Sequence, residues 1–180
     1  MERALVERVR SGDRAAFDAL VRKRIATVYR TSLAILGEPA DAADATQEAF
    51  VAAWRGRSGL RDPDLFDSWL GRITLNACRM QLRSRRRRVE REIRLPDPST
   101  EREPASAERA IDEQTAESDA FDRAFERLDA DDRAILVLHH LQARPVADIA
   151  ATLGCPEGTV KARLHRARAA LQSALARESR

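Results

Sequence analysis

One stretch, residues 144–175, RPVADIAATLGCPEGTVKARLHRARAALQSAL, decides how the C-terminal part of the chain folds. Ile149 and Leu153 form the apolar stripe of a short helix. Gly154 ends that helix, because glycine adopts the left-handed turn without steric cost. Pro156 suits the first turn of a second helix, where its missing N–H would be unpaired in any case. We therefore predict two helices joined by a tight glycine turn.

The second of these helices has one buried face and one basic face. Its apolar positions are spaced four, three and four residues apart, which is typical of a single buried face: Val160, Leu164, Ala167 and Leu171. The small residues Gly158 and Ala162 would let its outer side approach a groove closely. This arrangement indicates a helix-turn-helix whose second helix enters the major groove of DNA. A merely solvated basic face is the alternative. The basic side chains on its flanks and outer side are Lys161, Arg163, His165, Arg166 and Arg168.

Length and composition limit the class of protein. A chain of 180 residues holds one or two domains. Aromatic residues make up 4%, so the core must be built from Leu, Ile, Val and Ala. The chain has no apolar run of roughly 18 residues, and its first residues, MERALVERVRSGD, are charged throughout. We expect no membrane span and no signal peptide, which favours a cytoplasmic protein.

The cysteines and histidines do not form a ligand pattern. Cys78 and Cys155 are far apart in sequence and neither belongs to a CxxC motif. His139, His140 and His165 have no ligand spacing with either cysteine. We therefore expect no disulfide, no metal site and no cofactor.

Charge is distributed unevenly along the chain. Residues 1–88 carry 18 basic and 11 acidic side chains, a net charge of +7. Residues 89–120 have a net charge of −6, and residues 121–180 have a net charge of +2. Two positive blocks around a negative, proline-containing one suggest two nucleic-acid-facing domains on an acidic, flexible tether. We predict helical domains at residues 1–88 and 119–180, joined by a linker at residues 89–118.

Both blocks are predicted to be helical. Helices are expected at residues 2–10, from a cap at Asp13 to about Leu36, at 39–55 and from 67 to about 85, with a loop at 56–66. Asp67 is a plausible cap for the last of these, and Trp69 and Met80 supply apolar positions. In the C-terminal block, Asp129 caps a helix with Ile135, Leu136, Leu138 and Leu141 inside, preceded by one that carries Phe121, Phe125 and Leu128. The predicted fold class is all-α.

The helix at 39–55 carries an acidic stripe. Asp41, Asp44 and Glu48 fall on one face at helical spacing, opposite the apolar residues. Taken alone, the stripe is best interpreted as a solvated face, because exposed charge is normal. A docking strip for a basic partner is the alternative. A metal site is disfavoured, since no second carboxylate pair with matching spacing occurs.

The helix that starts near residue 67 carries a basic ridge. Arg72, Asn76, Arg79 and Arg83 follow one another at spacings of four, three and four residues. Beside an irregular loop, such a ridge suits contacts to phosphates and unstacked bases. A solvated helix face with a basic tail is equally compatible with these residues.

Three stretches resemble the signature segments of the bacterial extracytoplasmic-function (ECF, group IV) RNA polymerase sigma factors. They are DAADATQEAFVAAW at 41–54, FDSWLGRITLNACR at 66–79 and IAATLGCPEGTVKARLHRARAAL at 149–171. Their order and spacing and the length of the chain match that family. The resemblance implies two helical domains, called region 2 and region 4, that direct polymerase to promoters in a stress or envelope response.

The resemblance also implies a role for each group of residues. The acidic stripe, together with Gln47, would dock on the basic clamp helices of the polymerase β′ subunit, which reverses the preference for a solvated face. The loop and the basic ridge would bind the −10 promoter element and capture a flipped base, through Arg57, Ser58, Arg61, Arg72, Asn76, Arg79 and Arg83. The second helix of the helix-turn-helix would read the −35 element, through Glu157, Gly158, Thr159, Lys161, Ala162, Arg163, His165, Arg166 and Arg168.

The implied partners are core RNA polymerase, through its β′ clamp helices and β flap, and promoter DNA. Many members of the family are also held inactive by an anti-sigma factor. The linker would thread toward the active-site cleft, and the protein would have no catalytic residues of its own. Two rival hypotheses are a stand-alone regulator that binds duplex DNA as a dimer, and an enzyme that binds a metal on the acidic helix.

Overall fold

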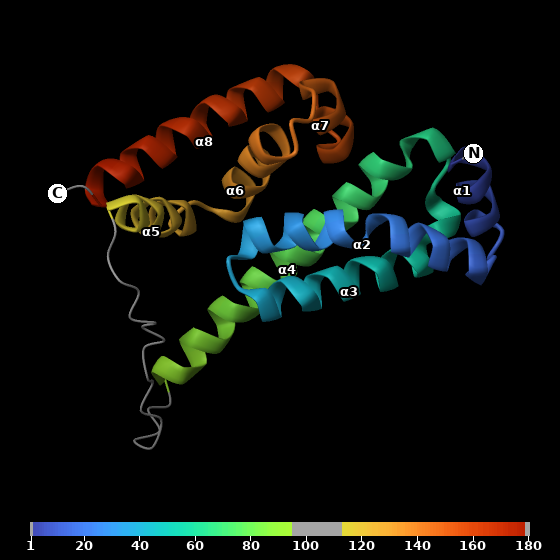
Figure 1. The fold of residues 1–180 in the computed structure, drawn as a ribbon, viewed down its shortest axis with the longest axis horizontal. Helices are drawn as coiled ribbons and strands as arrows, with labels where there is room; N and C mark the ends of the chain where they lie inside the picture. The colour runs from blue at the N-terminus through green and yellow to red at the C-terminus, as the bar shows by residue number, and fades with distance from the viewer. Residues whose placement is uncertain (1, 95–112, 179–180) are drawn as a thin grey trace.

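The computed structural model describes residues 2–94 and 113–178 (Figure 1). Every regular element within these ranges is a helix, which confirms the predicted all-α fold. None of the described helices combines the length and the apolar character that crossing a membrane requires. The α-helices are α1 (Glu2–Arg10), α2 (Arg14–Leu36), α3 (Pro39–Gly56), α4 (Phe66–Arg94), α5 (Glu113–Glu126), α6 (Ala130–Leu136), α7 (Val146–Leu153) and α8 (Glu157–Glu178).

Helices α1–α4 form the first unit. The Asp13 carboxylate accepts a hydrogen bond from the Ala16 N–H at 3.0 Å and so caps α2, as predicted. Gly37 ends α2 in the left-handed conformation, and its N–H donates to the Leu33 carbonyl at 2.8 Å. Helix α3 packs on α2 and α4 through a buried face that consists mostly of small side chains: Ala42, Ala45, Thr46, Ala49, Phe50 and Ala53.

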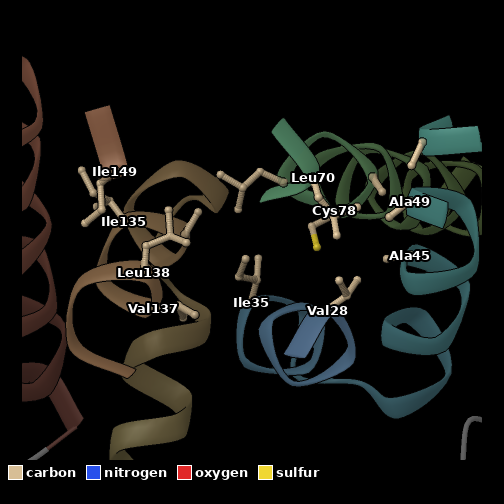
Figure 2. Close-up of a cluster of buried hydrophobic side chains, with 14 of the residues drawn as sticks. Val28, Ile35, Ala45, Ala49, Leu70, Cys78, Ile135, Val137, Leu138 and Ile149 are labelled. Carbon is tan, nitrogen blue, oxygen red and sulfur yellow. The ribbon is translucent and has the colours of Figure 1, made fainter. Parts of the chain in front are cut away.

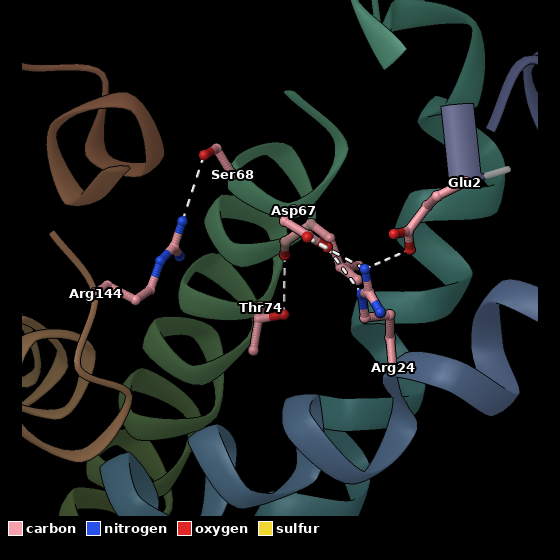
Figure 3. Close-up of polar contacts among 7 residues, drawn as sticks. Glu2, Arg24, Asp67, Ser68, Thr74 and Arg144 are labelled. Atoms are coloured by element: carbon pink, nitrogen blue, oxygen red, sulfur yellow. Dashed lines mark hydrogen bonds and ion pairs between the residues drawn. The ribbon is translucent and has the colours of Figure 1, made fainter. Parts of the chain in front are cut away.

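Helix α4 differs from the prediction at both ends. It begins at Phe66 and continues through Arg94, past the expected domain boundary at residue 88. Asp67 does not cap it and instead forms an ion pair with Arg24 of α2, whose Nε lies 2.8 Å from the carboxylate (Figure 3). The expected linker at 89–118 is thus helical through Arg94 and again from Glu113, and its residues 95–112 lie outside the described residues.

Helices α5–α8 form the second unit, which contains an irregular turn. Asp129 caps α6 by accepting from the Asp132 N–H at 2.7 Å, as predicted. After Leu136 the chain forms the π-helix η3 (Val137–Leu141), in which the Gln142 N–H reaches back to the Val137 carbonyl at 3.0 Å. A π-turn holds more residues than an α-turn, so it shifts the register of the side chains that follow. The prediction that Leu141 lies inside is therefore wrong: this side chain is 64% exposed.

Ala143 follows the π-helix with a backbone φ of +50°, in the left-handed region that disfavours residues with a Cβ. The change Ala143→Gly is expected to raise the free energy of unfolding by about 1 kcal/mol, because glycine takes this conformation without strain. Chemical denaturation measures the change. The matched control Ala169→Gly, at an exposed position inside α8, should lower stability by about 1 kcal/mol. A loss of stability in both variants would contradict the assigned strain.

The two units share one hydrophobic core (Figure 2). Ile35 of α2 and Leu70 of α4 face Leu138 of η3 and Ile149 of α7 across the boundary between the units. Each of these four side chains is at most 3% exposed. The sequence predicted two helical domains joined by a flexible linker, and it gave no sign that the two units pack against each other as they do in the structure.

Candidate functional site

The acidic stripe lies on the outer side of α3. Asp44, Gln47 and Glu48 are exposed and Asp41 is half-buried. None of the three carboxylates forms an ion pair with any residue that the structure describes. Their negative charge is therefore not neutralised within the described fold and can act on a partner.

Two surface grooves run along α3, and Asp44 and Glu48 of the stripe line the second of them. A groove of about 960 Å³ between α2 and α3 is mostly apolar, and another of about 510 Å³ lies between α3 and α4. Gln47 lines both grooves. Ile25 in the first groove is 46% exposed, and Met80 in the second is 57% exposed. Met80, which the sequence placed among the apolar positions of its helix, is thus not covered by the described fold, and a partner that meets the acidic stripe also meets these apolar side chains.

The loop between α3 and α4 is held against the rest of the first unit. It contains two short 3-10 turns, η1 (Arg57–Gly59) and η2 (Pro63–Leu65), and it buries Leu60, Pro63 and Phe66. Asp64 of η2 forms an ion pair with Arg3 of α1. These anchors leave Ser58 and Arg61 exposed at the surface of the loop.

Arg57 is placed differently from the other predicted loop residues. Its guanidinium lies over the Trp54 ring, 4.2 Å from the ring centre, and its Nη1 donates to the Trp54 carbonyl at 2.8 Å. Gly56, the last residue of α3, lies close to a second ring: a Cβ built on it would be 3.8 Å from Trp69, and both tryptophans are half-exposed. Sequence reasoning missed these rings as functional candidates, although indole faces are good platforms for unstacked bases.

The basic ridge lies on α4 and is divided between solvent and the second unit. Arg72, Asn76 and Arg83 are exposed. Arg79 is half-buried: its Nε lies 2.7 Å from the Asp131 carboxylate of α6, and its Nη1 donates to the Asn76 amide oxygen at 3.1 Å. The spacing in sequence indicated the ridge, but it gave no sign of the contact with α6.

The helix-turn-helix forms as the sequence predicts. Gly154 ends α7 in the left-handed conformation, with φ of +65°, and Pro156 directly precedes α8. Ile149 and Val160 are fully buried between the two helices, next to Leu164 and Ala167. The outer side of α8 is free in the described fold and gathers most of the predicted DNA-binding residues: Glu157, Gly158, Lys161, Ala162, His165 and Arg166 are exposed, and Thr159 and Arg163 are half-buried.

Arg168 lies apart from this group. Its Nε donates to His140 Nε2 at 3.2 Å, and both residues line a groove of about 600 Å³ along α5, η3 and α8. Burial is the largest cause that lowers the pKa of His140, and the positive charge of Arg168 adds to it. Phe121 and Leu141, predicted as apolar positions of the second unit, are exposed beside this groove. The groove is therefore an apolar surface that carries Arg168 and Asp122 as its charged residues.

Comparison with known families and proteins gives a consistent result. The family model for Sigma-70 region 2 matches residues 20–88, and the model for Sigma-70 region 4 matches residues 118–171. The ECF RNA polymerase sigma factor SigM of Mycobacterium tuberculosis is 37% identical over 161 residues, covering 89% of this chain and 78% of that protein. The RNA polymerase sigma-H factor of Pseudomonas aeruginosa is 33% identical over 187 residues, covering 97% and 93%.

Solved structures show the same architecture. The structure of CnrH in complex with the cytosolic domain of CnrY matches with a TM-score of 0.65 and 26% identity, covering 97% of this chain and 96% of that one. The sigma factor RpoE of Bartonella quintana, solved in complex with the anti-sigma factor NepR, matches with a TM-score of 0.63 and 26% identity, covering 88% and 96%. Similarity to these proteins therefore extends over both units.

Proposed function

The chain belongs to the ECF family of RNA polymerase sigma factors, and from this premise we propose a role for each of its exposed surfaces. The protein directs core RNA polymerase to specific promoters, and its partners are core polymerase and promoter DNA. We assign residues 1–88 to region 2 and 119–180 to region 4. The cytoplasm, where its polymerase acts, is the proposed location, and a stress or envelope response is the proposed setting.

The acidic stripe is proposed to dock on the clamp helices of the β′ subunit. The observation that carries this assignment is that the stripe holds three unpaired carboxylates, and that two of them, Asp44 and Glu48, line a groove that also holds the exposed side chain of Met80. A basic, amphipathic partner helix fits this combination, because charge steers its approach and apolar contact holds it. The apolar groove along α5, η3 and α8 is the proposed site for the β flap.

The DNA-facing surfaces are proposed on both units. Ser58, Arg61 and the basic ridge would hold the melted −10 strand, and Trp54 and Trp69 would offer their rings to unstacked bases. The outer side of α8 would read the −35 element in the major groove. An anti-sigma factor is a further proposed partner, supported by the solved complex of the structural relative RpoE with the anti-sigma factor NepR. We do not propose that the chain is an enzyme, because its proposed role is to recognise core polymerase and promoter DNA.

Reconstitution tests this function. The purified chain should co-elute with bacterial core polymerase, and the resulting holoenzyme should select one promoter class from random DNA and transcribe from it. A stand-alone regulator, the alternative that the relatives do not favour, would instead bind a palindromic duplex tightly without polymerase. If the native chain elutes separately from core polymerase, the assignment is contradicted.

The variant Arg166→Ala is expected to weaken −35 recognition by about tenfold, because one side chain contact to a base edge contributes on the order of 1–3 kcal/mol. Transcription from the selected promoter is compared with transcription from a copy with a mutated −35 element. The native factor should discriminate between the two templates, and the variant should discriminate less. Arg177→Ala, at the far end of α8, is the matched control and should behave as native. If the Arg166→Ala variant discriminates between the two templates as well as the native factor does, Arg166 does not take part in −35 recognition.

A further inference from the structure

One pocket has no part in the proposed recognition of polymerase or promoter DNA. It has a volume of about 420 Å³ and is bounded by α2, α4, the π-helix η3 and the start of α7. Its lining includes no residue of the acidic stripe, the basic ridge or the outer side of α8. Pockets for small molecules are typically about 300–1,000 Å³ and combine apolar surface with a few polar groups. The volume of this pocket therefore suits a small metabolite.

The walls of the pocket are partly apolar and partly hydroxylic. Val28, Leu70 and Leu138 supply apolar surface, and each of these side chains is at most 5% exposed. Thr31 and Thr74 also line the pocket, and each donates its hydroxyl proton to the backbone carbonyl four residues before it. Because that proton is already used, the hydroxyl oxygen can only accept further hydrogen bonds. The hydroxyls therefore suit a ligand that carries N–H donors.

Four charged side chains line the pocket, and two of them neutralise each other. The Arg24 Nε donates to the Asp67 carboxylate at 2.8 Å, and the Arg24 Nη2 donates to Glu2 of α1 as well (Figure 3). The guanidinium of Arg24 is thus shared between two carboxylates. The α2 side of the pocket therefore offers no free charge to a ligand.

The other two charged side chains, Arg144 and Asp148, have no such partner. Neither forms an ion pair with a residue that the structure describes. The guanidinium of Arg144 makes one long contact, from its Nη2 to the Ser68 hydroxyl at 3.4 Å (Figure 3). Arg144 directly precedes Pro145 and α7, and Asp148 lies in the first turn of α7. One positive and one negative group are therefore available at the same end of α7.

The space for the Arg144 guanidinium depends on a glycine in α4. A Cβ built on Gly71 would lie only 3.3 Å from Arg144 Nη1 and 3.2 Å from Thr152 Cγ2. Any larger residue at position 71 would push the guanidinium away from its place at the wall of the pocket. Glycine keeps this wall open to a positively charged side chain.

We propose that this pocket binds a free amino acid, whose carboxylate pairs with Arg144 and whose ammonium group pairs with Asp148. A ligand with a single charge would satisfy one of these groups and leave the other unpaired, whereas a zwitterion satisfies both. The threonine hydroxyls accept from the ammonium group, and the side chain of the amino acid lies on the apolar surface of Val28 and Leu138. This inference is independent of the proposed roles in transcription.

Binding is tested on the whole purified chain. Each of the common L-amino acids is added in turn at millimolar concentration, and thermal unfolding is followed by circular dichroism. At least one of them should raise the Tm by about 2 °C or more, because a ligand that binds only the folded state stabilises it. Acetate and ethylamine, which each carry one of the two charged groups, should leave the Tm unchanged.

Two variants remove one charge each from the pocket. Arg144→Gln and Asp148→Asn should each weaken the affinity for the stabilising amino acid by at least tenfold, since each deletes a charge-assisted contact. Titration calorimetry well below the Tm of each variant measures the affinity while that variant is folded. Arg22→Gln removes an exposed arginine of α2 that does not line the pocket, and this control should bind as the native chain does.

Three results would overturn the proposal. The first is that no amino acid raises the Tm or gives a heat of binding with the native chain. The second is that acetate or ethylamine raises the Tm as much as the amino acid does, because the pocket would then not recognise both charges. The third is that Arg144→Gln and Asp148→Asn bind the amino acid as tightly as the native chain, which would place its binding site elsewhere.

Discussion

Alanine at Asp41, Asp44 and Glu48 together is expected to abolish co-elution of the chain with core RNA polymerase. The three carboxylates form no ion pairs with the described residues, so their loss should leave the fold intact. Charge-assisted contacts contribute on the order of 1–2 kcal/mol each, so the dissociation constant should rise by at least about 100-fold. Fluorescence titration of labelled factor with core enzyme measures it.

Two control variants separate charge from other causes. Glu38→Ala removes an exposed carboxylate just before α3 and should bind core polymerase as the native chain does. The isosteric variant Asp41→Asn/Asp44→Asn/Glu48→Gln keeps the shape of the stripe and should lose binding as the alanine variant does. If the isosteric variant binds normally, charge is not what recognises polymerase. If the alanine variant binds normally, the stripe returns to being a solvated helix face.

The change Leu138→Ala is expected to destabilise both units together. Leu138 is 1% exposed and packs in the shared core opposite Ile35 (Figure 2). Removal of a buried leucine side chain costs about 2–5 kcal/mol, which corresponds to a fall in Tm of roughly 5–15 °C for a chain of this size. The two tryptophans of the chain, Trp54 and Trp69, are in the first unit, whereas Leu138 is in the second. Tryptophan fluorescence therefore reports on the unit that was not changed.

Circular dichroism and tryptophan fluorescence should give coincident melting curves for this variant, both shifted downward. The variant Leu138→Met conserves side-chain volume and should stay within about 1.5 kcal/mol of the native chain. An unshifted fluorescence transition in Leu138→Ala would show that the units unfold independently and that the shared core contributes little.

Local features of the fold were readable from the sequence because they depend on neighbouring residues. Asp13 and Asp129 cap their helices and Gly154 ends α7, since capping and turn chemistry act within a few residues. The register change at the π-helix was not readable, because an apolar residue such as Leu141 fits the α-helical spacing whether or not the turn widens. The exposure of Met80 was not readable either, because periodicity identifies an apolar position without indicating whether the fold covers it.

The candidate site shows the same difference between local features, which the sequence reveals, and long-range contacts, which it does not. The acidic stripe and the outer side of α8 each lie on one helix, so their spacing alone brought their residues together. The pairing of Arg79 with Asp131 joins residues 52 positions apart, and no local pattern contains it. Arg57 fits the predicted loop, yet its stacking on Trp54 depends on how that loop folds back. Contacts between the units are long-range, and a pattern within one segment cannot reveal them.

The shared core also has a consequence during synthesis on the ribosome. Residues 1–94 emerge first, and until residues 135–149 follow, the apolar side chains of Ile35 and Leu70 lack the partners that cover them in the finished fold. Nascent chains with uncovered apolar surface are prone to aggregation. A fragment that ends at residue 88 should therefore be less soluble than the whole protein. Chaperones that bind exposed apolar segments should associate with the incompletely synthesised chain.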